Sequence, residues 1–371
     1  MNVKKISSIL TAVLFSGIVG GFFLGHVVSP DGTFTTSERR RLAQFPEISA
    51  STIQSGTFMT NFEKYSLDQF PLRDSFRSLK AFCAYNIFGQ KDNNDIYEAE
   101  GYLAKIEYPI KENQITGAAV KFNTIYETYL QDVDVYFAMV PDKNYFLAEK
   151  HGYLRLDYDR LQTLFYENLS PAFQVIDIFD TLEIEDYYRT DTHWDQSMLA
   201  DTVDRIAEDM GFADRLSGVY TENTIENFYG VYAGQSAVSI EPDTLTYLTN
   251  EVLENCTVTN LETGSTTVYN LNKLTDGSSM DNYDIFLDGP AALITIENPA
   301  ADTDRELILF RDSFGSSIAP LFVEAYAKVT LVDLRYLSSE YLGDYVSFGE
   351  ADVLFLYSTT ILNTSEMLKV K

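Results

Sequence analysis

The sequence predicts an α/β protein in which helices cover both faces of a parallel sheet. Two observations carry this prediction. Short apolar runs of strand length recur along the chain, and segments whose apolar residues repeat at helical spacing lie between them. Strands that alternate with helices form βαβ units, whose strands lie parallel in one sheet. A chain of 371 residues is long enough to bury a substantial core in such a fold.

The N-terminal stretch predicts a membrane anchor. Residues 6–28 carry no charge, which matches the ~20 residues that cross a bilayer and exceeds the ~7–15 apolar residues of a cleaved signal. Lys4 and Lys5 favour a cytoplasmic N-terminus, whereas the arginines at 39–41 oppose it. Long following domains cross the membrane largely regardless of charge, so we predict a cytoplasmic tail and signal-anchor helix over residues 1–30, with the C-terminal domain outside the cytoplasm.

The remaining elements follow in order. Residues 31–51 are polar and turn-rich and predict a juxtamembrane linker, after which the α/β domain extends over residues 52–371. Pro71 separates two opening helical segments, because proline interrupts a helix. The core is then predicted as helix 122–129, strand 133–140, helix 161–169, strand 173–179, helix 195–210, strand 307–310, helix 315–327, strand 329–334 and strand 353–357.

One stretch, at about residues 217–299, breaks this alternation. It is rich in Thr, Asn, Tyr, Val and Gly, and its alternating runs at 256–259 and 266–269 are typical of hairpins. We therefore predict a β-rich insertion between the two halves of the α/β core.

Composition narrows the class of partner. The 55 acidic and 27 basic residues give a net charge of −28, which argues against nucleic acid. The 25 tyrosines and 25 phenylalanines suit a carbohydrate-facing surface, although aromatic cores are the commoner explanation. Cys83 and Cys256 are too few and too far apart for a metal site, and both a disulfide and two buried thiols remain open. We expect no metal or other cofactor.

A candidate nucleophile lies after the predicted strand at 307–310. The strand ends in a polar turn with Ser313 at its tip, and Gly315 follows before a helical segment. This order resembles a nucleophile turn, in which a strand delivers a serine to the edge of the sheet. A serine at such a joint is also explained as a helix N-cap, so the turn alone does not decide its role.

A candidate base lies in a second polar segment. His193 is one of three histidines and stands beside the only tryptophan, Trp194. Asp191, two residues before it, can hold the ring's Nδ1 hydrogen and leave Nε2 free to act as a base for a serine. We therefore predict that Asp191, His193 and Ser313 form a catalytic triad, and that Asp195 caps the following helix.

Other polar residues are predicted at the same edge, because ligands of parallel sheets bind beyond the carboxyl ends of the strands. The amides of Ser313 and Gly315 are candidate oxyanion donors, with Arg335 as a further candidate. Lys143 is a candidate for substrate or oxyanion contact, and solvated loop charge explains Lys143 and Arg335 equally well. Two aromatic side chains, Tyr336 and Trp194, complete the candidate substrate contacts.

Four motifs together carry a resemblance to a known family. They are the segment 190–194 (Thr-Asp-Thr-His-Trp), the turn 311–314 (Arg-Asp-Ser-Phe), 141–143 (Pro-Asp-Lys) and 37–42 (Ser-Glu-Arg-Arg-Arg-Leu). Over residues 35–360 the chain resembles the bacterial DHHW family, which is similar to the SGNH-like alginate acetylation proteins of the AlgX and AlgJ type.

The resemblance implies an SGNH-hydrolase-like three-layer fold and acyl-ester chemistry on surface glycans. It places Asp191, His193 and Ser313 on the family's catalytic positions. Two departures stand out. Thr192 replaces the first histidine of the family's name, and residues 287–290 lack the Gly-Asn that helps to build an SGNH oxyanion site.

Three functional hypotheses follow. The first is a membrane-anchored O-acetyltransferase or acetylesterase that acts on a cell-surface polysaccharide or another acyl acceptor, with a membrane protein that delivers acyl groups as a further expected partner. The second is a non-catalytic relative that binds a glycan or an assembly partner. The third is a surface hydrolase of another ester. The distance between His193 and Ser313 separates the first from the second.

Overall fold

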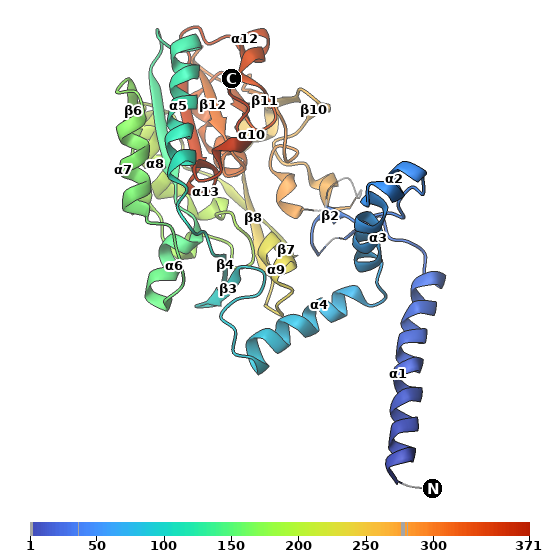
Figure 1. Cartoon of the computed structure of the whole chain (residues 1–371). Helices are drawn as coiled ribbons and strands as arrows, with labels where there is room; N and C mark the ends of the chain where they lie inside the picture. Colours follow the sequence, from blue (N-terminus) through green and yellow to red (C-terminus); the bar gives the residue numbers. More distant parts are fainter. Residues whose placement is uncertain (1–2, 36, 276–278, 280) are drawn as a thin grey trace. The chain divides into compact units, whose positions relative to one another are not determined.

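The chain divides into two compact units in the computed structural model, which describes residues 3–35, 37–275, 279 and 281–371 (Figure 1). Unit 1 comprises Met1–Asn93 and Gly234–Ser239, and unit 2 comprises Asn94–Ala233 and Ile240–Lys371. Some positions of the predicted segments lie outside the described residues. They are residues 1 and 2 of the tail, 36 of the linker, and 276–278 and 280 of the insertion.

Unit 1 begins with the apolar helix α1 (Val3–Val28), of which Lys5–Val28 is long and apolar enough to cross a membrane. The strands β1 (Phe34–Thr35) and β2 (Arg40–Arg41) then pair antiparallel inside the segment predicted as a linker. Three helices follow, α2 (Ala50–Gln54), α3 (Thr57–Asp68) and α4 (Arg73–Phe82), and a π-helical turn (Cys83–Ile87) continues the last of them. The interruption predicted at Pro71 therefore falls between α3 and α4.

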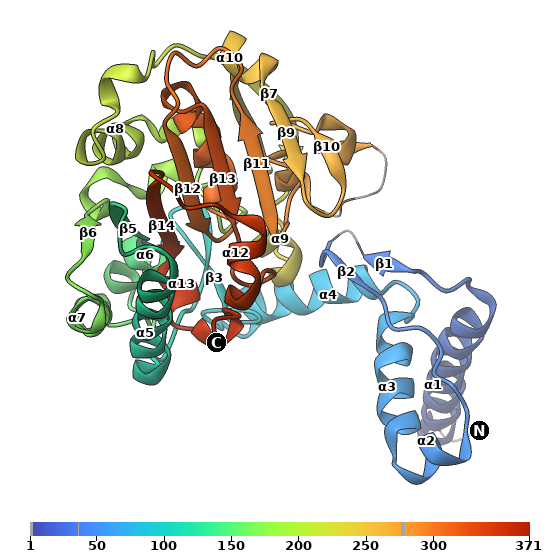
Figure 2. The same ribbon diagram turned by 90° about the horizontal axis from the view of Figure 1, so that it is seen from above.

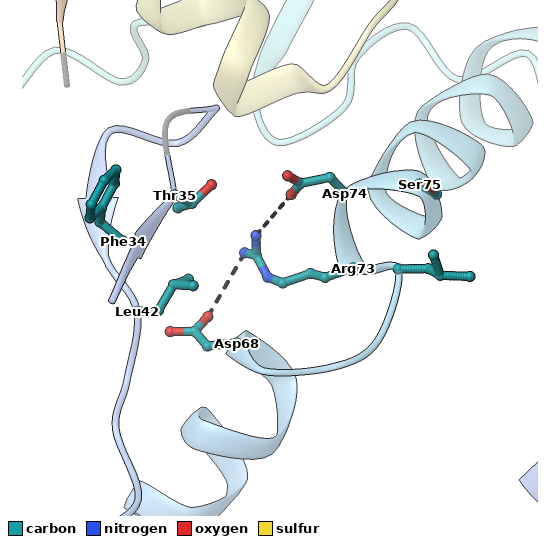
Figure 3. Close-up of a pocket in the computed structure, with 8 residues that line it drawn as sticks. Phe34, Thr35, Leu42, Asp68, Arg73, Asp74 and Ser75 are labelled. Carbon is teal, nitrogen blue, oxygen red and sulfur yellow. Dashed lines mark hydrogen bonds and ion pairs between the residues drawn. The ribbon is translucent and has the colours of Figure 1, made fainter. Parts of the chain in front are cut away.

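Charged side chains join the hairpin of unit 1 to its helices. Arg40 donates two hydrogen bonds to the Asp68 carboxylate, at 2.8 and 2.6 Å. Arg73 lies within 3.8 Å of Asp68 and 3.3 Å of Asp74 in a pocket of about 350 Å³ (Figure 3). Residues 31–51 thus pack as part of unit 1, and the compact unit that contains the sheet begins at Asn94 instead of the predicted residue 52.

Unit 2 is built around an eight-stranded sheet in the order β10-β9-β11-β13-β12-β14-β5-β6 (Figure 2). The five strands from β13 to β6 are parallel, and β11, β9 and β10 continue the sheet antiparallel. Their bounds are β5 Val135–Val140, β6 Phe173–Ile176, β9 Thr257–Asn260, β10 Gly264–Thr266, β11 Leu293–Glu297, β12 Glu306–Arg311, β13 Lys328–Val332 and β14 Asp352–Ser358. The large, mostly parallel sheet of the prediction is confirmed.

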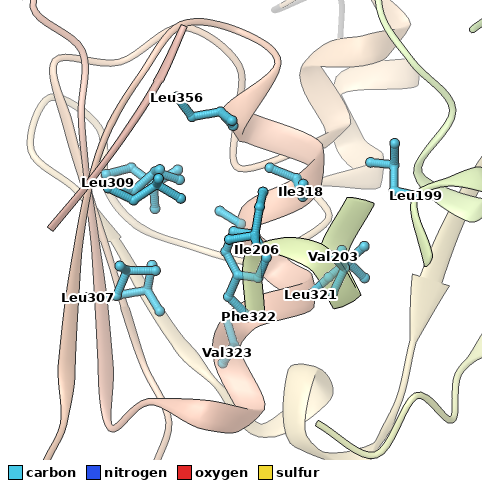
Figure 4. Close-up of a cluster of buried hydrophobic side chains, with 14 of the residues drawn as sticks. Leu199, Val203, Ile206, Leu307, Leu309, Ile318, Leu321, Phe322, Val323 and Leu356 are labelled. Atoms are coloured by element: carbon cyan, nitrogen blue, oxygen red, sulfur yellow. The ribbon is translucent and has the colours of Figure 1, made fainter. Parts of the chain in front are cut away.

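Both faces of the sheet are buried. Leu307 and Leu309 of β12 pack with helix α8 (Ala200–Asp209) and the segment after Ser313 (Figure 4), whereas the alternate residues Ile308 and Phe310 pack in a second cluster. Helices α5 (Glu112–Tyr129) and α7 (Tyr158–Asn168) supply that second cluster. A strand buried on both faces reads as a continuous apolar run, which is why the sequence shows these strands clearly.

The segment predicted as an insertion has two parts. The strands β7 (Thr221–Phe228) and β8 (Asp243–Thr249) form a separate hairpin. The strands β9, β10 and β11 instead extend the main sheet. Two short helices, α9 (Val231–Ser236) and α10 (Glu251–Asn255), also lie in it. The strands β9, β10 and β11 therefore belong to the main sheet and do not form part of a separate insertion.

Several elements were not predicted. The hairpin of β3 (Ile96–Ala99) and β4 (Tyr102–Lys105) precedes α5, and helix α6 (Lys143–His151) starts directly after β5 because the Asp142 side chain caps it by accepting from the Asn144 amide. The helix predicted over 315–327 is a short α-helical turn, α11 (Gly315–Ile318), followed by a 3₁₀ segment (Ala319–Ala325). Short helices α12 (Leu342–Tyr345) and α13 (Thr359–Leu362) complete the unit. Cys83 and Cys256 are free thiols.

Candidate active site

Ser313 lies in the turn just beyond the carboxyl end of β12. Asp312 fixes this turn, because its Oδ1 accepts from the Phe314 amide at 3.0 Å and its Oδ2 accepts from the Ser358 amide of β14 at 2.8 Å. The two parallel strands therefore share one carboxylate at their ends. Ser313 itself stays half-buried, with its hydroxyl at the edge of the sheet where ligands of such sheets bind.

The three predicted triad residues form one hydrogen-bonded chain. His193 Nε2 lies 2.7 Å from Ser313 Oγ, and His193 Nδ1 lies 2.6 Å from Asp191 Oδ1. Asp191 is fully buried and His193 is 6% exposed. A carboxylate can only accept, so Nδ1 carries the hydrogen on the aspartate side and Nε2 faces the serine hydroxyl as an acceptor.

The backbone holds Asp191 in place from the other side. Its Oδ2 accepts from the Val231 amide at 2.7 Å. Gly230 makes this approach possible, since a Cβ atom at that position would lie 2.3 Å from the Asp191 Cα. Neither residue carries a local sequence signal for this role, because the contact joins segments about forty positions apart.

Lys143 lies behind the aspartate and not in the pocket. The side chain is 2% exposed, and its Nζ donates to the carbonyls of Tyr188, Arg189 and Asp191 at 2.7, 3.1 and 2.8 Å. Burial lowers the pKa of Lys143 to about 7. The predicted contact with substrate or oxyanion therefore does not fit its position, and Lys143 instead fixes the loop that carries Asp191.

Replacement of Lys143 by methionine tests this structural role. A buried charge can oppose folding, in which case an apolar side chain of similar length would stabilise the protein. We expect the opposite, a loss of about 1–3 kcal/mol, because three buried carbonyls would lose their donor. Urea unfolding followed by Trp194 fluorescence measures the change. Lys150→Met is the matched control, since exposed Lys150 makes a surface ion pair with Glu100. Equal effects for the two variants would contradict the assignment.

Aromatic rings enclose the imidazole. Tyr283 stacks on His193 with 3.9 Å between the ring centroids and 5° between the planes, and its hydroxyl donates to Ser317 Oγ at 2.8 Å. Burial keeps the pKa of the Tyr283 phenol well above its ordinary value, so it stays neutral. Trp194 is fully buried and donates to Phe314 O and Ser317 Oγ. Trp194 therefore supports the turn after Ser313. Its buried position does not fit the substrate contact that the sequence predicts.

Asp195 caps the helical segment after the histidine, as predicted, because its carboxylate accepts from the Ser197 amide at 3.0 Å. Burial raises the pKa of Asp195 to about 6 from its ordinary 3.8. The folded state therefore holds this proton more tightly than the unfolded state does. The contribution of Asp195 to the free energy of unfolding should therefore fall as the pH rises from about 4 to 6, by up to about 3 kcal/mol.

Asp195→Asn should remove this pH dependence, since asparagine also caps helices but carries no proton to lose. We expect the variant to gain stability relative to the wild type between pH 4 and pH 7, as measured by urea unfolding at each pH. Parallel pH profiles for the two proteins would show that Asp195 titrates normally.

A pocket of about 220 Å³ opens beside the triad. His193 and Ser313 line it, together with Arg335 and Tyr336 from the end of β13. Arg335 is clamped by Asp333, with its Nη2 2.6 Å from Oδ2 and its Nε 2.9 Å from Oδ1. Tyr336 is 46% exposed. The structure thus places these two predicted contact residues in the same pocket as the candidate nucleophile.

Arg311, the last residue of β12, is a lining residue that the sequence reasoning did not assign. It is 1% exposed, and its Nε and Nη2 atoms have no hydrogen-bond partner among the residues that the structure describes. Nη1 donates to Asp312 O at 3.3 Å. Buried N–H groups without a partner are costly, so these donors are available to a ligand. The sequence does carry a signal for this role of Arg311, because a charged residue at the end of an apolar strand is unusual.

Gly315 makes room for Arg311, because a Cβ atom on Gly315 would lie 2.6 Å from the Arg311 Cβ. The Gly315 amide donates to Asp312 O at 3.2 Å, so it is not available as the predicted oxyanion donor. The Ser313 amide meets no acceptor in the described part of the chain. Across that same part, no group of three or more His, Cys, Asp or Glu side chains could hold a metal ion.

Comparison with known proteins confirms the resemblance to the DHHW family. The family model described as DHHW protein matches residues 178–332. A DHHW family protein from Eubacterium siraeum has a similar structure, with a TM-score of 0.60 and 20% identity over 74% of this chain and 94% of that one. Bacillus cereus PatB1 with a sulfonyl adduct gives a TM-score of 0.57 and 20% identity over 74% of this chain and 98% of that one.

The O-acetyltransferase domain of Pseudomonas putida AlgJ matches more weakly, with a TM-score of 0.42 and 11% identity over 71% of this chain and 90% of that one. No curated protein matches the chain. At these identities the first two structures establish a shared fold, and the chemistry has to be argued from the residues of this chain.

Proposed function

We propose that the chain is a membrane-anchored, SGNH-like serine acyl-ester enzyme that acts outside the cytoplasm, as an O-acetyltransferase or acetylesterase of a cell-surface polysaccharide. The hydrogen-bonded chain from Asp191 through His193 to Ser313 carries this proposal. It ends in a pocket large enough to admit an acetyl group, and the resemblance to the DHHW family supports the glycan substrate. A non-catalytic relative would not need His193 within 2.7 Å of Ser313.

The first half of the reaction acylates the serine. His193 Nε2 takes the proton from Ser313 Oγ as the oxygen attacks the acetyl carbonyl. The carbonyl electrons move to its oxygen, and the tetrahedral intermediate then collapses and breaks the bond to the leaving alcohol. The imidazolium returns its proton to that alcohol, and the acetyl group stays on Ser313. Asp191 stabilises the transient imidazolium without becoming protonated itself.

The second half releases the acetyl group. A sugar hydroxyl, or water, gives its proton to His193 Nε2 and attacks the acetyl-serine carbonyl. Collapse of this intermediate restores the Ser313 hydroxyl with the proton from the imidazolium. An acceptor held in the pocket competes with bulk water through an effective molarity that reaches ~10⁵ M or more for well-oriented groups, so the acceptor decides between transfer and hydrolysis.

The oxyanion needs donors beside Ser313. The Ser313 amide and the Nε and Nη2 atoms of Arg311 are the candidates, since all three lack partners among the described residues and Arg311 lines the same pocket. Burial lowers the pKa of Arg311, yet a guanidinium remains charged in proteins and suits a developing negative charge. Arg311 would thus fill the role left open by the missing Gly-Asn motif.

The test uses full-length protein in lipid nanodiscs with 4-nitrophenyl acetate. We expect slow release of nitrophenol from the ester alone and faster release when an accepting oligosaccharide is added, with acetyl groups appearing on the sugar. Ser313→Ala should abolish all three signals. If wild type and Ser313→Ala release nitrophenol at the same rate under both conditions, the chemistry does not belong to this site.

The proposed location gives a separate prediction. If α1 spans the membrane over Lys5–Val28, the long domain beyond Pro30 should lie outside the cytoplasm, because such domains cross largely regardless of charge, and protease added to intact spheroplasts should digest it. A cytoplasmic marker protein is the control for membrane integrity. Protection of the whole chain while the spheroplasts stay intact would show that the domain does not lie outside the cytoplasm.

A further inference from the structure

The corner between α3 and α4 packs against the last turns of the apolar helix α1. Phe22 stacks on Phe70 with 5.2 Å between ring centroids and contacts Phe76 edge-on at 5.5 Å. Pro71 lies so close to Gly25 that a Cβ atom there would be 3.3 Å from the proline ring. Three aromatic rings and a proline therefore fix this corner to one level of α1, and all of these contacts are within unit 1.

The length of α1 determines how deep in a bilayer the corner between α3 and α4 would lie. Lys5–Val28 contains 24 residues, or about 36 Å of helix at ~1.5 Å per residue. The hydrocarbon core of a bilayer is about 30 Å thick, which needs ~20 residues. A span that starts at Lys5 therefore leaves the hydrocarbon near Gly25. The corner, which packs against Phe22 and Gly25, therefore falls at the boundary between acyl chains and headgroups.

The helix that leaves this corner has an apolar face that stays largely exposed, although Phe76 also contacts Phe22 and Phe70. Leu72, Phe76, Leu79 and Phe82 are 68%, 42%, 53% and 56% exposed, and they recur at the spacing of one helical face. Leu72 has a left-handed backbone (φ 60°), which is unusual for a leucine, so the chain holds an apolar side chain at the tip of the corner. Such a face suits an apolar environment, not water.

Two arginines of α4 are held by polar contacts inside unit 1. Arg73 pairs with Glu38, and Arg77 lies 3.4 Å from Glu38 and donates to the Gly234 carbonyl at 2.7 Å. Both arginine side chains are only 17% exposed. The helix is thus amphipathic: Arg73 and Arg77 fold against their own unit, whereas the apolar face and other polar side chains, such as Asp74 (65% exposed) and Lys80, face outward.

We propose that α4 and the corner before it lie in the membrane interface, with Leu72, Phe76, Leu79 and Phe82 inserted among the acyl chains of the leaflet where α1 emerges. An amphipathic helix in the plane of the interface buries its apolar face in this way, and Phe and Leu are typical residues of such a face. The occupant of the face is lipid. The inference rests on α1 as a membrane span and is independent of the ester chemistry.

Depth-dependent quenching of a fluorophore tests the proposal in full-length protein. Single cysteines at position 72 or 79, made in a Cys83→Ser, Cys256→Ser background, are labelled with a nitrobenzoxadiazole dye. The proteins are then placed in pure-lipid nanodiscs that carry nitroxide spin labels at shallow or deep acyl positions. Phe15→Cys in the middle of α1 is the inserted reference, and Gln54→Cys at the exposed end of α2 is the solvent reference.

We expect dyes at 72 and 79 to lose fluorescence with shallow spin labels, the dye at 15 with deep ones, and the dye at 54 with neither. A dye at 15 that is quenched while those at 72 and 79 behave like the one at 54 would overturn the proposal. The proposal would also be overturned if the dyes at 72 and 79 were shielded from water in native membranes but not in pure-lipid nanodiscs, because that result would assign the face to a protein partner. Absence of quenching at 15 would refute the membrane span and the inference with it.

Discussion

Treatment of the protein with an activated acetyl ester is expected to add one acetyl group, on Ser313. A serine hydroxyl needs a base to attack an ester, and His193 Nε2 stands 2.7 Å from this oxygen with its other nitrogen held by a buried carboxylate. Mass spectrometry of the peptides measures both the added mass and its position. An aryl sulfonyl fluoride should modify the same residue, and prior sulfonylation should block acetylation.

Two variants make this result specific. Ser313→Ala should lose all labelling and all turnover, whereas Ser316→Ala should keep them. Ser316 lines the same pocket, and its amide donates to the Ser313 carbonyl, but its hydroxyl is not bonded to the histidine. An acetyl group found on Ser316 would place the nucleophile on the wrong serine, and equal labelling of several surface serines would show that labelling reflects exposure and not activation by His193.

The sequence predicted those parts of the fold and site that depend on local patterns. Strands such as β12 and β14, buried on both faces, appear as unbroken apolar runs and were placed within one or two residues. The role of β9 to β11 was not predicted, because alternation identifies a strand but not its neighbour in the sheet. Strand order depends on which faces meet in three dimensions.

The candidate site shows the same division. Asp191 and His193 are two residues apart, so their pairing could be read locally, and the turn at Ser313 has its own pattern. Tyr283 reaches His193 only through the folding of distant segments. Lys143 was expected at a solvent-facing edge, yet it donates to the carbonyls of Tyr188, Arg189 and Asp191, and sequence does not show where carbonyls converge.

The sharpest test of the proposed triad is Asp191→Asn, which changes one oxygen to an NH₂ group without changing size. Asp191 must accept on both sides, from the Val231 amide through Oδ2 and from the His193 amide and ring through Oδ1. An asparagine can satisfy only one side. If its oxygen faces Val231, its NH₂ group faces Nδ1, and the imidazole must then carry its hydrogen on Nε2, where it cannot take the serine proton.

We therefore expect Asp191→Asn to lower kcat by up to ~10⁴, the loss known for this change in serine proteases. KM should be little altered, because Asp191 is not among the residues that line the pocket. His193→Ala should remove base function and lower kcat at least as far. Circular dichroism should remain that of the wild type in both. Asp195→Asn, in the same segment but with a side chain that accepts from Ser197 and not from the histidine, is the control that should retain activity. If Asp191→Asn retained wild-type kcat while remaining folded, the carboxylate would be a structural anchor for the Val231 loop, and Ser313 would have to be activated by a group other than this pair.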